Sequence, residues 1–248
     1  MERVTFPSDG LELSGILHTP DGAAGERRPG FLVLHGFGSN KEGGNSRVVS
    51  KTLADFGYVA LRFDFRGCGE SEGPRGRTIC LEQVEDTRNA LSFMAQRPEV
   101  DGERIAAIGS SFGAAVAIYA AGVDSRVAAC VSCGGWGDGV KKFRKQHESP
   151  EAWKRFIDMM AEGRRRRERG EPELMVPRFD IVPIPPGLRG NLSQGSIMEF
   201  PFDVVESMYG FMANDMVGKI APRPLLLDRK STRLNSSHIQ KSRMPSSA

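Results

Sequence analysis

The chain has 248 residues, 39% of them apolar and 26% charged, and a formal net charge of +3. This length fits one large α/β domain, and the composition is typical of a soluble globular protein and excludes a long disordered chain. No apolar run approaches the roughly 18 residues of a membrane span, and the N-terminus lacks the apolar stretch of a signal peptide, so we expect a cytoplasmic protein.

The first half of the chain alternates apolar runs with helical patterns. This predicts βαβ units around a mostly parallel sheet that is buried on both faces. The N-terminal RVTF and the alternating LELSGILH predict an antiparallel hairpin. Further strands are predicted at residues 31 to 36, 58 to 65, 104 to 110 and 127 to 133, with helices around SRVVSKTLADFG, LEQVEDTRNALSFMAQ and FGAAVAIYAAG.

Four cysteines are too few for a disulfide scaffold at this length. Cys130 and Cys133 form a C-x-x-C, but VAACVSC has the pattern of a buried strand. No second Cys or His pair lies at zinc spacing, so we predict a structural role for both thiols, no metal site and no cofactor.

The alternation stops at residue 136. Residues 136 to 202 are interpreted as a cap inserted over the sheet, because they contain one helical pattern and then a proline-rich run. Four apolar side chains of that helix recur at helical spacing: Trp153, Phe156, Ile157 and Met160. Trp153, Phe156 and Met160 are expected to cover the mouth of the site, or else only to anchor the cap to the core. A returning helix at 202 to 213 and a buried strand at 221 to 227 follow.

The basic run from Arg164 to Arg167, with Arg169, lies in the predicted cap helix. We interpret it as a solvated helix face and predict no nucleic-acid partner, because the rest of the chain is nearly neutral. Residues 229 to 248 hold five of the 34 basic residues and none of the 31 acidic ones, so residues 1 to 228 are slightly acidic.

Residues 109 to 113, GSSFG, match the G-x-S-x-G nucleophile elbow, in which a sharp turn between a strand and a helix exposes the serine hydroxyl. A second match surrounds Ser71, but it lies in a loop rich in glycine, with no small-residue helix directly after it. We therefore predict Ser111 as the nucleophile. The alternative is a tight turn without chemistry.

An acyl-transfer serine also needs donors for the oxyanion that forms when it attacks a carbonyl. The backbone N–H of Phe112, at the start of the helix, is one candidate. The N–H of Phe37, in the loop LHGFGSNKEGG after an earlier strand, is the other. His35 lies beside the glycine turn, and we interpret it as bracing this loop and not as a base.

Three stretches, HGFGSNKEG, RFDFRGCGESEG and GSSFGA, in this order on alternating strands, resemble the α/β-hydrolase superfamily, in particular its bacterial esterase and serine-aminopeptidase-like branch. The resemblance covers residues 1 to 227. It implies an α/β-hydrolase fold with a cap, Ser111 as nucleophile, and Phe37 and Phe112 as oxyanion donors. It also implies the chain order serine, acid, histidine.

The acid and the histidine are expected after the strand at 221 to 227. Residues 229 to 248 show neither a strand pattern nor a glycine turn, and they resemble translated sequencing-adapter remnants. We therefore expect a core at 1 to 228 that lacks its final strand and helix, followed by a tail that is not native.

Asp228 and His238 have the right order, but they are only ten residues apart. That spacing leaves no room for the helix and strand that normally return the histidine to the serine. The catalytic acid and base are therefore expected to be absent from this chain.

The sequence thus predicts a parent enzyme that cleaves carboxylic esters of small molecules through an acyl-enzyme intermediate, without metal or cofactor. The chain as given is expected to be inactive. A peptidase or acylaminoacyl hydrolase is the second hypothesis, because the same triad cleaves amides. A non-catalytic binding member of the fold is the third.

Overall fold

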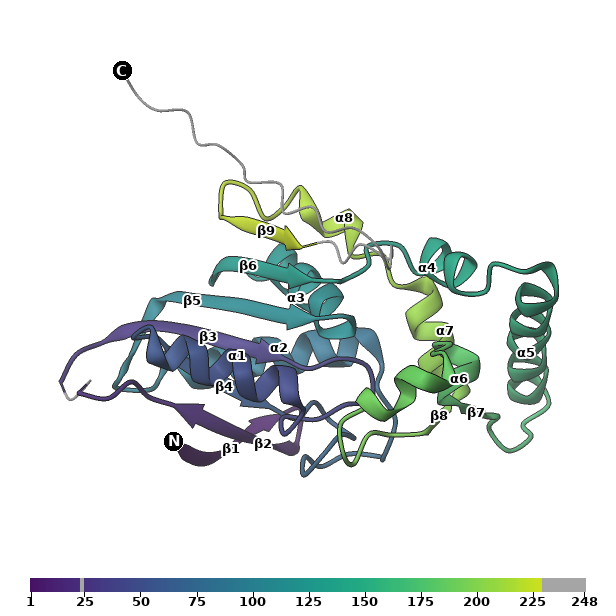
Figure 1. The fold of residues 1–248 in the computed structure, drawn as a ribbon, viewed down its shortest axis with the longest axis horizontal. Helices are drawn as coiled ribbons and strands as arrows, with labels where there is room; N and C mark the ends of the chain where they lie inside the picture. Colours follow the sequence, from purple (N-terminus) through teal and green to yellow (C-terminus); the bar gives the residue numbers. More distant parts are fainter. Residues whose placement is uncertain (23–24, 229–248) are drawn as a thin grey trace, which may run out of the picture.

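The computed structural model describes residues 1–22 and 25–228, and its centre is a seven-stranded sheet in the order β1-β2-β4-β3-β5-β6-β9 (Figure 1). Its strands are β1 (Glu2–Ser8), β2 (Leu11–His18), β3 (Arg28–Leu34), β4 (Val59–Phe63), β5 (Val100–Ser110), β6 (Val127–Cys133) and β9 (Leu225–Asp228). β2 pairs antiparallel with β1 and with β4, whereas every pair from β4 to β9 is parallel. The predicted hairpin and the mostly parallel sheet are confirmed.

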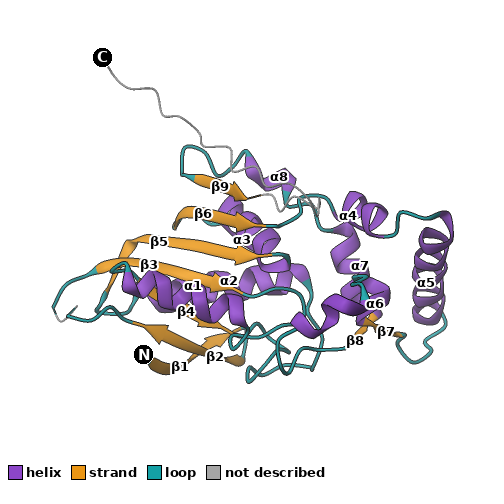
Figure 2. Ribbon diagram, in the orientation of Figure 1, coloured by secondary structure: helices purple, strands orange, loops and turns teal. Residues whose placement is uncertain are grey.

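Helices cover both faces of the middle of the sheet (Figure 2). α1 (Gly44–Asp55) lies against β3 and β4 on one face, while α2 (Cys80–Ala95) and α3 (Phe112–Val123) pack together on the other. Every residue of β4 is buried, as expected for a strand of a parallel sheet that is covered on both sides.

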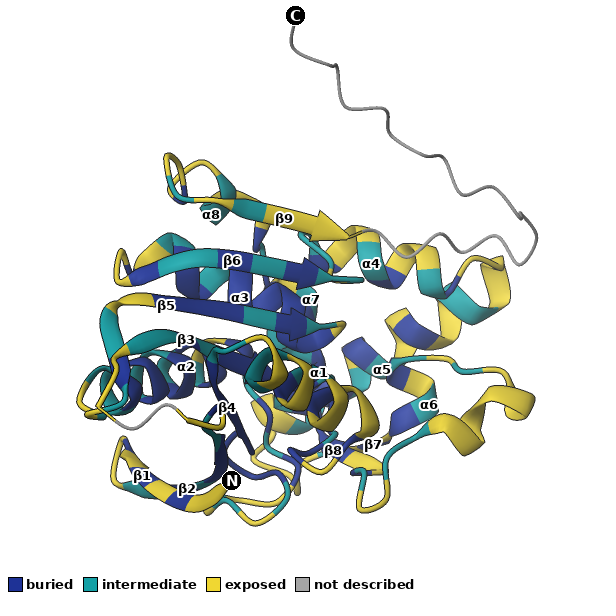
Figure 3. Cartoon of the chain, turned by 60° about the vertical axis from the view of Figure 1, so that its left-hand side comes forward, coloured by how far each residue is buried: buried dark blue, intermediate teal, exposed yellow. Residues whose placement is uncertain are grey.

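The edge of the sheet formed by β9 is much less covered than its middle. β9 pairs with β6, and the short helix α8 (Asn214–Val217) that precedes it packs on α3. Leu226 and Leu227 of β9 are 61% and 57% exposed, and β9 is drawn largely as exposed in Figure 3. Cys130 and Cys133 are free thiols within β6, as the strand interpretation of VAACVSC predicted.

Between β6 and α8 the chain leaves the sheet and builds a cap beyond the carboxyl ends of the parallel strands (Figure 1). The elements there are α4 (Gly139–Gln146), α5 (Pro150–Glu168), β7 (Met175–Pro177), α6 (Arg178–Ile181), a 3-10 helix (Pro186–Asn191), β8 (Glu199–Pro201) and α7 (Phe202–Gly210). None of the helices in the described ranges is both long and apolar enough to cross a membrane.

α5 is the helix that carries the predicted apolar stripe. Phe156 and Met160 are buried, but Ile157 is 38% exposed and is not part of the packed face. Phe156 stacks on Phe143 of α4 with ring centroids 4.8 Å apart, and Trp153 stacks on Phe156 at 5.6 Å. The stripe therefore anchors α5 within the cap.

Candidate active site

Ser111 occupies the turn between β5 and α3 in a strained backbone conformation, with φ 53° and ψ −113°. The glycines of its motif are required by close backbone contacts. A Cβ on Gly109 would lie 2.1 Å from the carbonyl oxygen of Gly113, and a Cβ on Gly113 would lie 2.5 Å from that of His35. The Ser111 N–H donates to Cys133 O at 2.9 Å, so the elbow is tied to the end of β6, while its side chain is exposed.

A cavity of about 330 Å³ lies in front of Ser111, between the elbow, the loop after β3 and the cap. From the core it is lined by Gly36, Phe37, Ser111 and Phe112, and from the cap by Trp136, Lys142 and Arg178. Neither Trp153 nor Phe156 nor Met160 lines it, so the expectation that they cover the mouth of the site is wrong; their apolar faces pack against other cap residues instead.

The two amides predicted as oxyanion donors border this cavity. Phe112 is the first residue of α3, so its N–H has no acceptor within the helix. Neither the Phe112 N–H nor the Phe37 N–H donates to another group in the described part of the chain. A Cβ on Gly36 would lie 3.7 Å from Ser111 Cβ, which places the loop that carries Phe37 directly against the elbow.

His35 is buried beneath this loop, and both of its ring nitrogens have partners. Nε2 accepts a hydrogen bond from the N–H of Phe65 at 3.2 Å, so Nδ1 carries the proton and donates it to Gly36 O at 2.9 Å. Burial lowers the pKa of His35, which keeps it neutral. These contacts are those of a loop brace.

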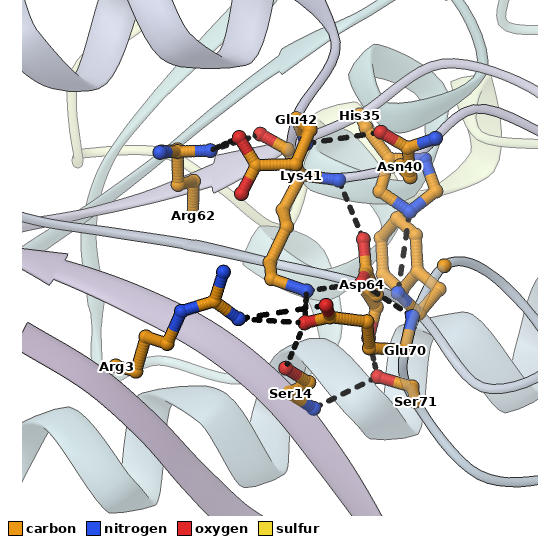
Figure 4. A network of polar contacts seen from close by, with 12 residues as sticks. Arg3, Ser14, His35, Asn40, Lys41, Glu42, Arg62, Asp64, Glu70 and Ser71 are labelled. Atoms are coloured by element: carbon orange, nitrogen blue, oxygen red, sulfur yellow. Dashed lines mark hydrogen bonds and ion pairs between the residues drawn. The ribbon is translucent and has the colours of Figure 1, made fainter. Parts of the chain in front are cut away.

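Lys41 fixes the far end of the same loop through a buried ion pair (Figure 4). Its Nζ contacts Asp64 Oδ2 at 2.6 Å and Glu70 Oε2 at 2.7 Å, and its backbone N–H donates to Asp64 Oδ1 at 2.5 Å. The side chains of Lys41 and Asp64 are each 1% exposed. The loop after β3 is therefore fixed to the core at both ends, by His35 at its start and by Lys41 at its end.

Ser71, the serine of the second G-x-S-x-G, is engaged in the same region. Its Oγ donates to Asp64 O at 2.6 Å and accepts the N–H of Ser14 at 2.9 Å (Figure 4). It joins β2 to the loop after β4 and does not line the cavity of Ser111.

The cap holds the loop from above through residues that sequence analysis did not identify. Arg178 is buried, and its Nη2 donates to Phe37 O at 2.6 Å while its Nη1 donates to Ile197 O at 2.9 Å. The ring of Phe200 stacks on that of Phe37 at 4.2 Å. Burial lowers the pKa of Arg178 to about 10. This contact pattern could be found only in the structure, because β7, α6 and β8 are too short to show a periodic signal.

Among residues 1–22 and 25–228, no histidine, aspartate or glutamate lines the cavity beside Ser111. Asp228 ends β9, and its carbonyl oxygen accepts the N–H of Gly134 at 2.7 Å. His147 contacts carbonyl oxygens within the cap, and His18 accepts a hydrogen bond from Arg62 Nε at 3.1 Å. The other half of the pair considered above, His238, lies outside the described residues. These residues also contain no cluster of three or more His, Cys, Asp or Glu side chains that could hold a metal ion.

Comparison with known proteins agrees with the fold. A model of the alpha/beta hydrolase family matches residues 31–230. A polyketide transferase of Aspergillus fumigatus is 38% identical over 137 residues, which are 53% of this chain and 44% of that protein. A thiohydrolase of Arthrinium phaeospermum is 31% identical over 181 residues, which are 71% of this chain and 54% of that protein.

A solved structure of a hypothetical protein from Pseudomonas aeruginosa superposes with a TM-score of 0.73 at 26% identity, covering 91% of this chain and 76% of that one. The matches to the polyketide transferase and the thiohydrolase span about half the length of each of those proteins.

Proposed function

The chain belongs to the alpha/beta hydrolase family, and on that premise we propose that Ser111 is the nucleophile of a serine hydrolase that cleaves carboxylic esters. One observation carries the proposal. Ser111 has a strained backbone with positive φ, and its side chain opens into a cavity bordered by two amides that have no partner among the described residues. A turn with no chemistry would be less strained with glycine at that position.

The reaction follows from the groups around Ser111. Its Oγ attacks the acyl carbonyl and gives up its proton to a base, while the N–H groups of Phe37 and Phe112 stabilise the negative oxygen. Loss of the alcohol, which takes the proton, leaves an acyl-enzyme. Water then attacks this ester and releases the acid and Ser111. We place the base and its acid outside the described residues.

Thioesters are a second class of substrate for the same step. The names of the two relatives, a thiohydrolase and a polyketide transferase, support this class. A thiolate leaves more readily than an alkoxide, and the elbow and its amides would serve both reactions without change.

The test uses the full-length gene product and p-nitrophenyl butyrate. We expect Ser111→Ala to lower kcat/KM at least about 1000-fold, because members of a serine triad act as a unit. Ser71→Ala is the matched control from the second G-x-S-x-G, and it should keep the activity at some cost in stability. Activity that survives Ser111→Ala would refute the assignment.

Two other outcomes would favour the alternatives. Faster cleavage of aminoacyl amides than of any ester would indicate a peptidase. A folded protein that neither turns over ester, thioester or amide nor forms an acyl adduct at Ser111 would indicate a binding protein.

A further inference from the structure

The charged side chains that line the Ser111 cavity are all cationic. Two of its lining residues are cationic, Lys142 and Arg178, and none is a carboxylate. The Nη1 and Nη2 of Arg178 are used on backbone carbonyls of the loop and the cap, so this side chain has a structural role. Of Arg178 only Nε is left without a partner among the described residues, whereas the Lys142 ammonium, from α4, uses one donor, on Gln146.

Lys142 has an unusual environment for a lysine. Its Nζ donates one hydrogen bond, to Gln146 Oε1 at 2.8 Å, and lies 4.1 Å from the ring centroid of Phe143 and 5.4 Å from that of Trp136. It forms no ion pair with any described residue. Residues 23–24 and 229–248 contain no aspartate or glutamate, so they add no acidic side chain that could pair with it.

A desolvated ammonium without a counter-ion costs free energy, and burial lowers the pKa of Lys142 to about 7. Three further polar atoms of residues that line the same cavity, Trp136 Nε1, Ser196 Oγ and Arg178 Nε, are buried and have no partner within the described residues. The hydrogen-bond acceptor of Lys142 among the described residues is the neutral side chain of Gln146. An anionic ligand in the cavity would give the Lys142 ammonium an acidic partner.

We propose that Lys142 is the recognition residue of an anion subsite in this cavity, and that the substrate cleaved at Ser111 carries a carboxylate or phosphate group. This rests on the proposed function, because it assigns the substrate class of that same site. A carboxylate would lie on the acyl side of the scissile bond, whereas a phosphate would belong to a leaving group such as a phosphopantetheine thiol.

The experiment measures binding, so that it does not depend on turnover. Isothermal titration of the full-length protein compares two pairs of non-hydrolysable probes, each pair matched in shape and differing in charge. Glutaric acid monoanilide is compared with its primary amide, and phosphopantetheine with pantetheine. We expect at least about a 10-fold preference for the charged member of one pair, as for a hydrogen bond to a charged group.

Lys142→Met should reduce that preference to less than about 3-fold. The matched control is Lys145→Met, which removes the same charge from an exposed position of the same helix. Lys142→Arg should keep the preference. In the wild type the preference should fall as the pH rises from 6 to 9, because Lys142 loses its proton, and Lys142→Arg should abolish this dependence.

Equal binding of charged and neutral probes in both pairs would overturn the proposal, and so would a preference that survives Lys142→Met. The pair that shows the preference identifies whether the anion is on the acyl or the leaving side. A failure of the proposed function is distinguishable, since it would appear as missing turnover with the charge preference intact.

Discussion

The core side and the cap side of the Ser111 site differ in whether their buried cationic side chains have acidic partners. Below the loop that carries Phe37, Lys41 is 1% exposed and contacts both Asp64 and Glu70 (Figure 4). Above it, in the cap, Lys142 and Arg178 have no acidic partner among the described residues. A paired buried charge fixes one arrangement of the chain, whereas an unpaired one keeps free energy available for a ligand. On the proposed function, the core side is thus suited to fixing the position of Ser111 and its amides, and the cap side to binding the substrate.

Lys41→Met gives the largest expected effect on stability. It leaves the Asp64 carboxylate buried without its counter-ion, so we expect the free energy of unfolding to fall by about 3–5 kcal/mol in urea denaturation. The matched control is Lys51→Met, which breaks the exposed pair with Asp55 and should cost less than about 1 kcal/mol. Similar losses for both variants would remove the contrast between the two sides.

Arg178→Met tests the link between the cap and the loop that carries Phe37, the proposed oxyanion donor. Arg178 acts as a positioning residue through Phe37, whose carbonyl it holds at 2.6 Å. We expect kcat for p-nitrophenyl butyrate to fall about 10- to 100-fold with little change in KM, because a misplaced donor affects the transition state more than the bound ester.

Arg189→Met, an exposed arginine of the same cap, is the control for Arg178→Met and should leave both constants unchanged. A rise in KM alone would instead assign Arg178 to substrate binding.

The core side was largely predictable from the sequence, because its signals are local. Gly109, Ser111 and Gly113 lie within five residues, and the steric limits that require these glycines are already implied by a strand followed by a helix. Phe37 and His35 could be placed because they follow a recognisable strand. Lys41 was not identified, since its partners Asp64 and Glu70 are more than 20 residues away.

The cap side was predictable only in outline. Its helices were expected, but the direction of the α5 stripe was wrong, because helical spacing shows which residues share a face and not which neighbour covers that face. The sequence did not single out Lys142. Asp138 stands four residues before it, at a spacing that suggests an ion pair, but in the structure Asp138 caps α4 and contacts Lys141 instead.

Trp153→Ala should have a moderate effect that is the same for every substrate. Trp153 is half-buried against Phe156 and does not line the cavity, so we expect a loss of about 1–2 kcal/mol in stability. The ratios of kcat/KM among acetyl, butyryl and octanoyl p-nitrophenyl esters should not change. A shift in preferred chain length would show that α5 reaches the acyl group after all.

Lys142→Met is not expected to lower stability near pH 7, and it separates the two lysines by how stability depends on pH. The pKa of Lys142 is about 7 in the folded protein against 10.5 for an unperturbed lysine, so between these values the unfolded chain binds more protons than the folded one. The free energy of unfolding should therefore rise with pH over this window, by at most about 1.4 kcal/mol per unit because a single proton is exchanged. Lys142→Met should lack this contribution and should be as stable as the wild type, or more so, near pH 7. Urea titrations of both proteins from pH 6.5 to 10 measure the difference, in which all other titrating groups cancel. If Lys142→Met instead loses several kcal/mol of unfolding free energy at pH 7, as Lys41→Met is expected to, then Lys142 is a structural cation like Lys41. In that case it would not be available to bind an anionic ligand.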